Sequence, residues 1–205
     1  KKQEYQVKFN PYFTYVNDYI DAVACSVVGA SCMSRSDGFS TLSLDNQSAR
    51  IYGFNISGFK NLGYYKNFGD IKVTGSLAYV RGRNNNTHDN LYRIMPLNLK
   101  LALEQISGSW RNNLELVAVK RKGRVSSIRN EHQTPGYSLV NIASNYSYMD
   151  ATFNMSLTNL FDRKYSDPLG GTYIGQGATM MTGVNNGVAV PGMGRSINVG
   201  VLYNF

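Results

Sequence analysis

The sequence has no apolar run that approaches the roughly 20 residues a membrane-spanning helix requires. A helical membrane protein is therefore excluded, whereas a β-barrel is not, because barrel strands alternate apolar and polar residues. Histidine is scarce, with only His88 and His132, and the 13 acidic residues are scattered. Because no catalytic triad and no paired-carboxylate spacing is visible, the sequence predicts no enzyme and offers no candidate catalytic residue.

Cysteine is equally rare, and both cysteines lie in one segment rich in Ser, Gly and Asp. Cys25 and Cys32 are the only two in the chain. Two cysteines in one polar segment predict a disulfide formed in an oxidising compartment. A metal site needs more ligands than this pair, and Met33 is the only other candidate ligand nearby.

The start of the chain lacks both an initiator methionine and a signal-peptide pattern. We therefore expect either a mature protein or a piece of a larger one. No linker, charge run or low-complexity segment divides the sequence, so we predict that residues 1–205 form one structural unit.

Positive charge exceeds negative charge, giving a formal net charge of +8. A basic patch raises the hypothesis of nucleic-acid binding. We expect no nucleic-acid partner, because the aromatic residues alternate along strands and no binding motif is present. The alternatives are a solvated loop end and attraction to an anionic lipid surface. The densest basic run comprises Lys120, Arg121, Lys122, Arg124 and Arg129.

The last eleven residues show strict period-two alternation, which predicts a half-buried β-strand. Its opposite face is mostly small or polar, as a strand with lipid outside and water inside would be. An edge strand of a soluble sandwich would share this pattern. The apolar, aromatic-tipped face comprises Ile197, Val199, Val201, Tyr203 and Phe205, and we expect it to be the signal for barrel assembly.

Seven further segments alternate in the same way, so the predicted fold class is all-β. The segment between the second and third of these, residues 60–69, predicts a turn region because of its Asn and Gly residues. We expect the first strand to run on into residues 17–24 and the start of the second to reach back into residues 39–44. The eight strands are predicted at residues 5–15, 46–59, 70–83, 97–104, 110–118, 139–148, 152–158 and 195–205.

The connections between these strands alternate in length. Long polar loops follow the first, third, fifth and seventh strands, and shorter turns such as Ser107-Gly108 and Met149-Asp150 follow the others. This is typical of an antiparallel transmembrane β-barrel meander in the bacterial outer membrane, with extracellular long loops and a periplasmic C-terminus. A Greek-key sandwich would not enforce such alternation.

Eight strands could close alone into a small barrel. Small barrels fill their interior with packed side chains, whereas the polar faces here are rich in Ser, Thr and Asn. We therefore predict the wall of a wider barrel. In that case residues 5–15 and 195–205 do not pair with each other.

Four segments, in this order along the chain, carry a resemblance to a known family. They are Asn46-Gln-Ser-Ala-Arg-Ile-Tyr-Gly53, Pro135-Gly-Tyr-Ser-Leu-Val-Asn141, Thr158-Asn-Leu-Phe-Asp-Arg-Lys-Tyr165 and Pro191-Gly-Met-Gly-Arg195. With them the chain resembles the C-terminal third of TonB-dependent outer-membrane receptors, whose barrel of about 22 strands is plugged by an N-terminal domain. Residues 89–98 and 167–180 are similar to the copper-receptor branch.

The resemblance implies energised uptake of a metal, with copper favoured, or of a metal chelate such as a siderophore. It also implies that the plug and the earlier strands lie outside this chain. The implied partners are outer-membrane lipid and lipopolysaccharide, the TonB complex acting through the absent N-terminal part, and the barrel-assembly machinery. No intrinsic cofactor is expected. The alternative function is a small self-contained or passive barrel, porin-like or adhesin-like.

Copper(I) prefers thioether and thiolate ligands, and imidazole also binds copper. The candidate metal ligands are Met180, Met181 and His88, although packing against neighbouring loops is the favoured explanation for the two methionines. The other loop-borne candidates are Met33, Met95, His132 and Met193.

Overall fold

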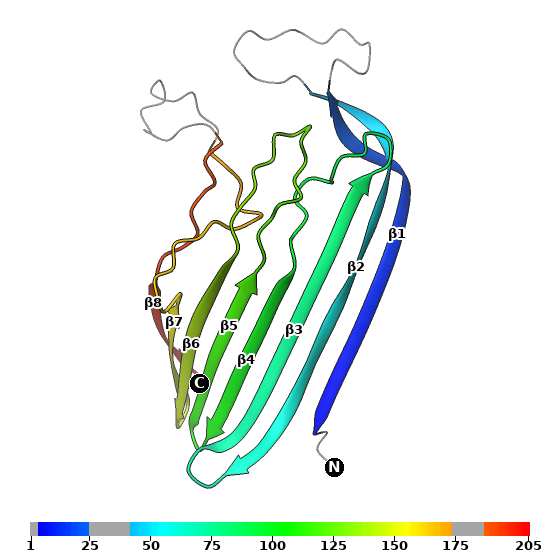
Figure 1. The fold of residues 1–205 in the computed structure, drawn as a ribbon. Helices are drawn as coiled ribbons and strands as arrows, with labels where there is room; N and C mark the ends of the chain where they lie inside the picture. Colours follow the sequence, from blue (N-terminus) through cyan, green and yellow to red (C-terminus); the bar gives the residue numbers. More distant parts are fainter. Residues whose placement is uncertain (1–3, 25–41, 174–186) are drawn as a thin grey trace, which may run out of the picture.

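The computed structural model describes residues 4–24, 42–173 and 187–205, and its strands form one antiparallel sheet (Figure 1). Within these ranges no helix is long and apolar enough to cross a membrane. Strand order in the sheet follows the sequence, so each strand lies beside the next. The strands are β1 (Tyr5–Ala24), β2 (Leu42–Tyr65), β3 (Gly69–Asn84), β4 (Asn98–Ser107), β5 (Trp110–Val119), β6 (Tyr137–Tyr148), β7 (Ala151–Thr158) and β8 (Ser196–Tyr203).

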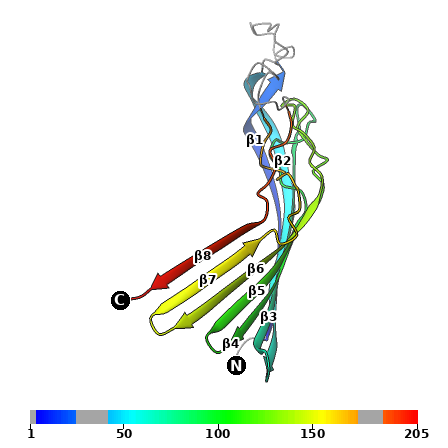
Figure 2. The ribbon, with the colours of Figure 1, turned by 90° about the vertical axis from the view of Figure 1, so that its left-hand side faces the viewer.

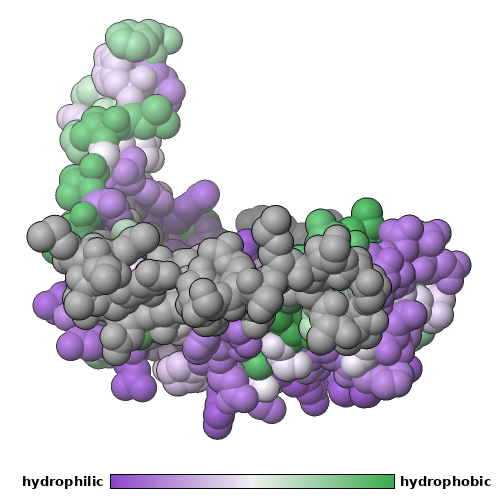
Figure 3. Space-filling view, turned by 90° about the horizontal axis from the view of Figure 1, so that it is seen from above, coloured by the Kyte–Doolittle hydropathy of each residue, from purple (hydrophilic) through white to green (hydrophobic). Residues whose placement is uncertain are grey.

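The register places the apolar residues of all eight strands on one face. Leu101 lies opposite Leu116, which in turn lies opposite Val140. Directly paired residues share a face of the sheet, so such rows build one apolar face and one polar face. Viewed from above, the arm formed by the last strands carries hydrophobic residues on its outer side and hydrophilic residues toward the hollow of the sheet (Figure 3).

The apolar face is not covered by any described part of the chain. Val199 is 76% exposed, and Phe13 and Ile197 are exposed to a similar extent. Among the described residues the only buried hydrophobic side chains are those of Ala22, Val23, Ala49, Leu91 and Val119. A sheet with so small a core needs an apolar surrounding, which is what a lipid-facing wall receives from the bilayer.

The sheet is open at both edges, as predicted. β1 pairs with β2 and β8 pairs with β7, but no ladder in the described ranges joins residues 5–15 to residues 196–203. The sheet curves across its strands, and β1 and β8 lie at its two opposite edges (Figure 2). These eight strands therefore do not close into a barrel by themselves.

The predicted turn at residues 60–69 is wrong in its extent, because β2 continues to Tyr65. A bulge between Asn61 and Gly63, with Gly63 at a φ of 97°, absorbs the irregular residues without ending the strand. The actual turn is shorter and is closed by a 3.0 Å hydrogen bond from the Phe68 N–H to the Tyr65 carbonyl. The turn at Met149 and Asp150 lies where it was predicted, and the other short turn lies at Gly108 and Ser109, one residue later than predicted. Gly108 and Met149 have positive φ.

The residues predicted as the assembly signal occupy the edge strand β8. On the apolar face, β8 pairs with β7 through Ile197, Val199, Val201 and Tyr203. The Phe205 ring contacts the Tyr203 ring at a centroid distance of 5.3 Å. Because Tyr203 lies opposite Ala151, β8 ends beside the short turns. Recognition of this strand by the assembly machinery stays a prediction.

Candidate functional site

The long connections fold together at one end of the sheet into what we call the loop layer (Figure 1). It comprises residues 85–97 between β3 and β4, residues 120–136 between β5 and β6, and the described parts of the β7–β8 connection, residues 159–173 and 187–195. In a barrel wall this end would carry the ligand-binding surface.

A buried ion pair inside the β5–β6 connection also holds the other two connections. The Lys122 Nζ lies 2.6 Å from the Glu131 Oε1, and the two side chains are only 1% and 8% exposed. Lys122 also donates to the Pro168 carbonyl at 2.9 Å, in the β7–β8 connection. Glu131 accepts backbone N–H bonds from Ser126 at 2.9 Å and Arg93 at 3.0 Å. The pair therefore ties all three connections to one point.

Asp89 joins the β3–β4 connection to the β5–β6 connection. Its carboxylate accepts hydrogen bonds from the N–H groups of Ser127 and Ile128 at 3.2 and 3.1 Å, and from the hydroxyls of Ser126 and Ser127 at 2.9 and 3.0 Å. Burial acts to raise the pKa of Asp89, but these four donors outweigh it and hold the pKa below its ordinary value of 3.8.

Acidification is expected to loosen this junction. Because its folded pKa is lowered, Asp89 stabilises the junction fully above pH 3.8 and loses that contribution as pH falls through the folded pKa. Amide hydrogen exchange of Ser127 and Ile128, corrected for intrinsic rates, should show lower protection at pH 3 than at pH 5. Asp89→Asn should lower protection at pH 5 by about tenfold, roughly 1–2 kcal/mol. Asp150→Asn, in a short turn at the other end, should leave it unchanged, and equal protection in wild type and Asp89→Asn would contradict the assignment.

A second ion pair fastens the loop layer to the polar face of the strands. The Arg129 Nη2 lies 3.1 Å from the Asp21 Oδ1 near the end of β1, and the Asn84 Nδ2 donates to the Asp21 Oδ2 at 3.1 Å. The Arg129 guanidinium also lies 5.3 Å from the Tyr92 ring centroid. The loop layer is thus fixed against the strands that rise beside it.

The Thr158–Tyr165 segment ends β7 and closes the base of the last connection. Asn159, at a φ of 51°, donates through its Nδ2 to the carbonyls of Arg163 at 3.0 Å and Met193 at 3.2 Å. The Arg195 N–H donates to the Asp162 Oδ1 at 2.9 Å. These bonds bring the two ends of the connection together just before β8 begins.

A pocket of about 730 Å³ lies within the loop layer. Its lining includes both charges and an aromatic ring, namely Tyr92, Arg129, Glu131, His132 and Asp167. Glu131 and Arg129 are occupied by the ion pairs described above, whereas His132 and Asp167 form no ion pair with any described residue. The pocket offers polar and imidazole contacts on a preorganised frame.

The predicted metal ligands all stay predictions. Met180, Met181 and the proposed Cys25–Cys32 disulfide lie outside the described residues and stay predictions. His88 is exposed at a φ of 58°, and its carbonyl accepts a 3.3 Å hydrogen bond from the Arg83 Nε. In the described ranges no group of three His, Cys, Asp or Glu side chains could hold a metal ion.

The structural residues of the loop layer were not predicted. Lys122 was recognised only as part of a basic run, and Glu131, Asp89 and Asp21 were not singled out. Lys122 and Glu131 are 9 positions apart in the sequence, and Asp21 and Arg129 are 108 positions apart. The only available signal was the resemblance itself, since Asp89 begins one of the segments similar to the copper-receptor branch and Asn159 lies in another family segment.

No protein-family model and no curated protein matches the sequence. Solved structures do match, each over 100% of this chain. The copper transporter OprC is 22% identical with a TM-score of 0.81, and the chain covers 30% of it. The FrpB iron transporter from Neisseria meningitidis is 11% identical with a TM-score of 0.68, at 30% coverage. FpvAI, in its complex with pyocin S2, is 11% identical with a TM-score of 0.65, at 26% coverage.

The chain thus spans less than a third of each structure it matches. Two of these neighbours are transporters by name, one of copper and one of iron. The fold expected from the sequence is confirmed: the chain has the fold of a barrel portion of TonB-dependent receptors.

Proposed function

We propose that this chain forms barrel wall and extracellular loops of an outer-membrane transporter that takes up a metal ion or a metal chelate, with copper favoured. The observation that supports this most is the match of the whole chain to a copper transporter at a TM-score of 0.81. The open edges of β1 and β8 agree with it, because a wider barrel would supply a neighbouring strand to each.

The chemistry of the two faces supports the same role. The polar face carries hydrogen-bonded side chains, such as Asn141 donating to the Glu115 Oε1 at 2.8 Å, that suit a hydrated lumen around a plug. The apolar face suits lipid. The loop layer would then receive the substrate outside, while the TonB complex would act through a plug that this chain does not include.

Uptake by cells that make the full-length protein tests this function. Radioactive copper should accumulate in an energy-dependent manner, and accumulation should be lost in cells without TonB. Accumulation that is indifferent to TonB would instead favour a passive barrel. A parallel uptake measurement with iron bound to a siderophore distinguishes a copper transporter from a transporter of metal chelates.

Copper ligation by Met180 and Met181 is tested by replacing both with leucine. We expect a roughly 10- to 100-fold loss of Cu(I) affinity in the purified full-length protein, because thioethers are preferred Cu(I) ligands. Competition with a chromogenic chelator measures it. The matched control is Met149→Leu with Met155→Leu, since these methionines lie in a short turn and on the apolar face. Unchanged affinity in the Met180 and Met181 variant would remove these two residues as ligands.

A further inference from the structure

The apolar face has a polar boundary at the end near the short turns. There the Asn112 Nδ2 donates to the Gln105 Oε1 at 2.9 Å, and the Ser144 Oγ donates to the Asn112 Oδ1 at 2.6 Å. Toward the loop layer, β4 continues on this face with Leu103, Leu101 and Leu99. In an outer-membrane wall the far end of this apolar band would lie at the level of the lipid headgroups.

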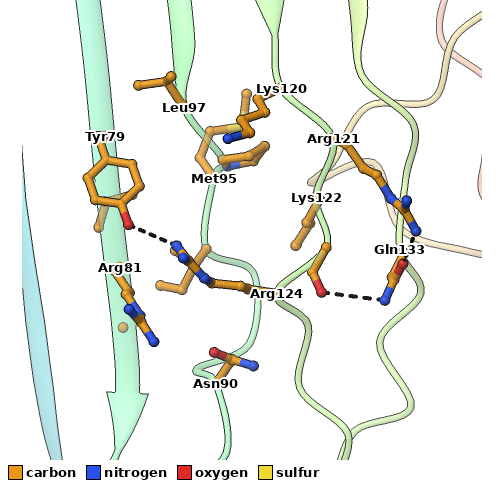
Figure 4. A pocket seen from close by; sticks show the side chains of 15 residues that line it. Tyr79, Arg81, Asn90, Met95, Leu97, Lys120, Arg121, Lys122, Arg124 and Gln133 are labelled. Atoms are coloured by element: carbon orange, nitrogen blue, oxygen red, sulfur yellow. Dashed lines mark hydrogen bonds between the residues drawn. The ribbon is translucent and has the colours of Figure 1, made fainter.

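Aromatic rings mark that far boundary. The Tyr79 ring lies 5.7 Å from the Phe54 ring, which lies 6.1 Å from the Phe9 ring, all on the apolar face. Aromatic belts lie where a membrane protein meets the headgroups. The Tyr79 hydroxyl accepts a 2.8 Å hydrogen bond from the Arg124 Nη1, which brings a guanidinium to this level (Figure 4).

Beside Tyr79 lies a pocket of about 530 Å³ that is lined by cations. Figure 4 shows Arg81 and Arg124 near Tyr79, with Lys120 and Arg121 across the pocket. None of the described residues that line it is acidic, and Lys122, the fifth cation, is already paired with Glu131. We call Arg81, Lys120, Arg121 and Arg124 the rim cations.

The rim cations have no anionic partner among the described residues. Arg121 donates to the neutral Gln133 Oε1 at 2.5 Å, and Arg124 donates to the Tyr79 hydroxyl. The Arg81 Nε is buried and makes no hydrogen bond. Four like charges in one pocket repel one another, so an anion bound between them would be stabilised.

An apolar groove begins directly below this pocket. It is about 550 Å³ in volume and exists because Gly58 and Gly75 face each other across β2 and β3. A Cβ on Gly58 would lie 2.5 Å from the Gln6 carbonyl, so no side chain can fill the groove there. Its walls include Val7, Ile56, Leu77, Leu99 and Leu101.

The pocket and the groove are continuous along the strands. On β3, Leu77 lines the groove and Tyr79, the next residue on the same face, lines the pocket. Beside them, Leu99 of β4 lines the groove and Leu97, just before β4, lines the pocket. An amphiphile could therefore place its acyl chains in the groove and its headgroup among the rim cations.

We propose that this surface binds one lipid that carries more than one phosphate group, as lipopolysaccharide of the outer leaflet does. The number of uncompensated cations argues for several phosphates, and the groove argues for acyl chains. Tyr79 and the groove lie on the apolar face, opposite to the polar face of the sheet. The proposal rests on the proposed function only in placing the loop layer outside the cell.

The test measures lipid binding to the detergent-purified full-length protein by native mass spectrometry, with diphosphoryl lipid A as the probe. Arg81→Gln, Lys120→Gln and Arg124→Gln together should weaken binding at least tenfold. The control, Lys66→Gln with Arg163→Gln and Lys164→Gln, removes the same charge from exposed positions elsewhere and should bind as wild type does. Gly75→Leu, which fills the groove, should also weaken binding, and heat-modifiable migration in electrophoresis confirms that each variant is folded.

Two further probes decide what is recognised. Monophosphoryl lipid A and phosphatidylglycerol should each bind at least tenfold more weakly than diphosphoryl lipid A. Equal binding of all three, or equal loss in the rim and control variants, would overturn the proposal. Copper uptake is measured separately in the Gly75→Leu variant, whose substitution lies on β3 outside the loop layer, and should stay at the wild-type level, so failure of this proposal is distinguishable from failure of the transport function.

Discussion

Replacing Glu131 with alanine is expected to destabilise the loop layer by about 3–5 kcal/mol, because it leaves the Lys122 ammonium buried without its counter-ion. Lys122 would keep its bond to the Pro168 carbonyl, but a single neutral acceptor does not compensate a desolvated charge. The N–H groups of Ser126 and Arg93 would lose their acceptor as well. All three connections should therefore loosen together.

Limited proteolysis with trypsin measures this loosening, because the β5–β6 connection contains Arg124 and Arg129 as cleavage sites. Cleavage there should accelerate on the order of 100-fold or more in Glu131→Ala, while the strands stay protected. Glu104→Ala is the matched control: its partner Arg111 is 62% exposed and 3.6 Å away, so its loss should change stability by less than about 1 kcal/mol. Replacing Lys122 with methionine and Glu131 with leucine together should restore protection. Wild-type cleavage rates in Glu131→Ala would show that the pair contributes nothing.

The strands could be predicted because their signal is local and periodic. Leu99, Leu101 and Leu103 alternate with polar residues, and the pairing of β4 with β3 and β5 places all three on the apolar face. The alternation within each strand is enough to assign its residues to the apolar or the polar face. The alternating lengths of the connections then predict the order of the strands in the meander. The open sheet also followed, since polar inner faces do not fill the interior of a small barrel.

The loop layer could not be predicted because its contacts join distant residues without any period. Arg129 contacts Asp21, which is 108 positions away in the sequence. Lys122 comes close to Glu131 because an antiparallel bridge between Lys122 and Thr134 folds the connection back on itself. The extent of β2 was missed for a related reason. Asn and Gly usually indicate a turn. Here Gly63, at positive φ, forms a β-bulge, and β2 continues to pair with β3 on both sides of it.

Introducing arginine at Leu116 is expected to cost about 2–4 kcal/mol in folding free energy in a bilayer, the penalty for a cation on the lipid face at mid-depth. Leu116 lies midway between Asn112, at the polar boundary, and Lys120, at the rim, and it pairs with Leu101 and Val140. No acidic residue shares its row on these neighbouring strands, so the guanidinium would have lipid and leucine around it.

The same arginine placed on the other face provides the decisive comparison. Ala102 lies on the polar face opposite Glu115 and beside Thr74, so Ala102→Arg gains a counter-ion and should change stability by less than about 1 kcal/mol. Urea unfolding of the full-length protein in lipid vesicles measures both variants, with Leu116→Met as an apolar control that should behave as wild type. A larger penalty at Ala102 than at Leu116 would mean that the faces are reversed. The lipid would then lie against the polar side, and both the lumen and the lipid site proposed above would have to be abandoned.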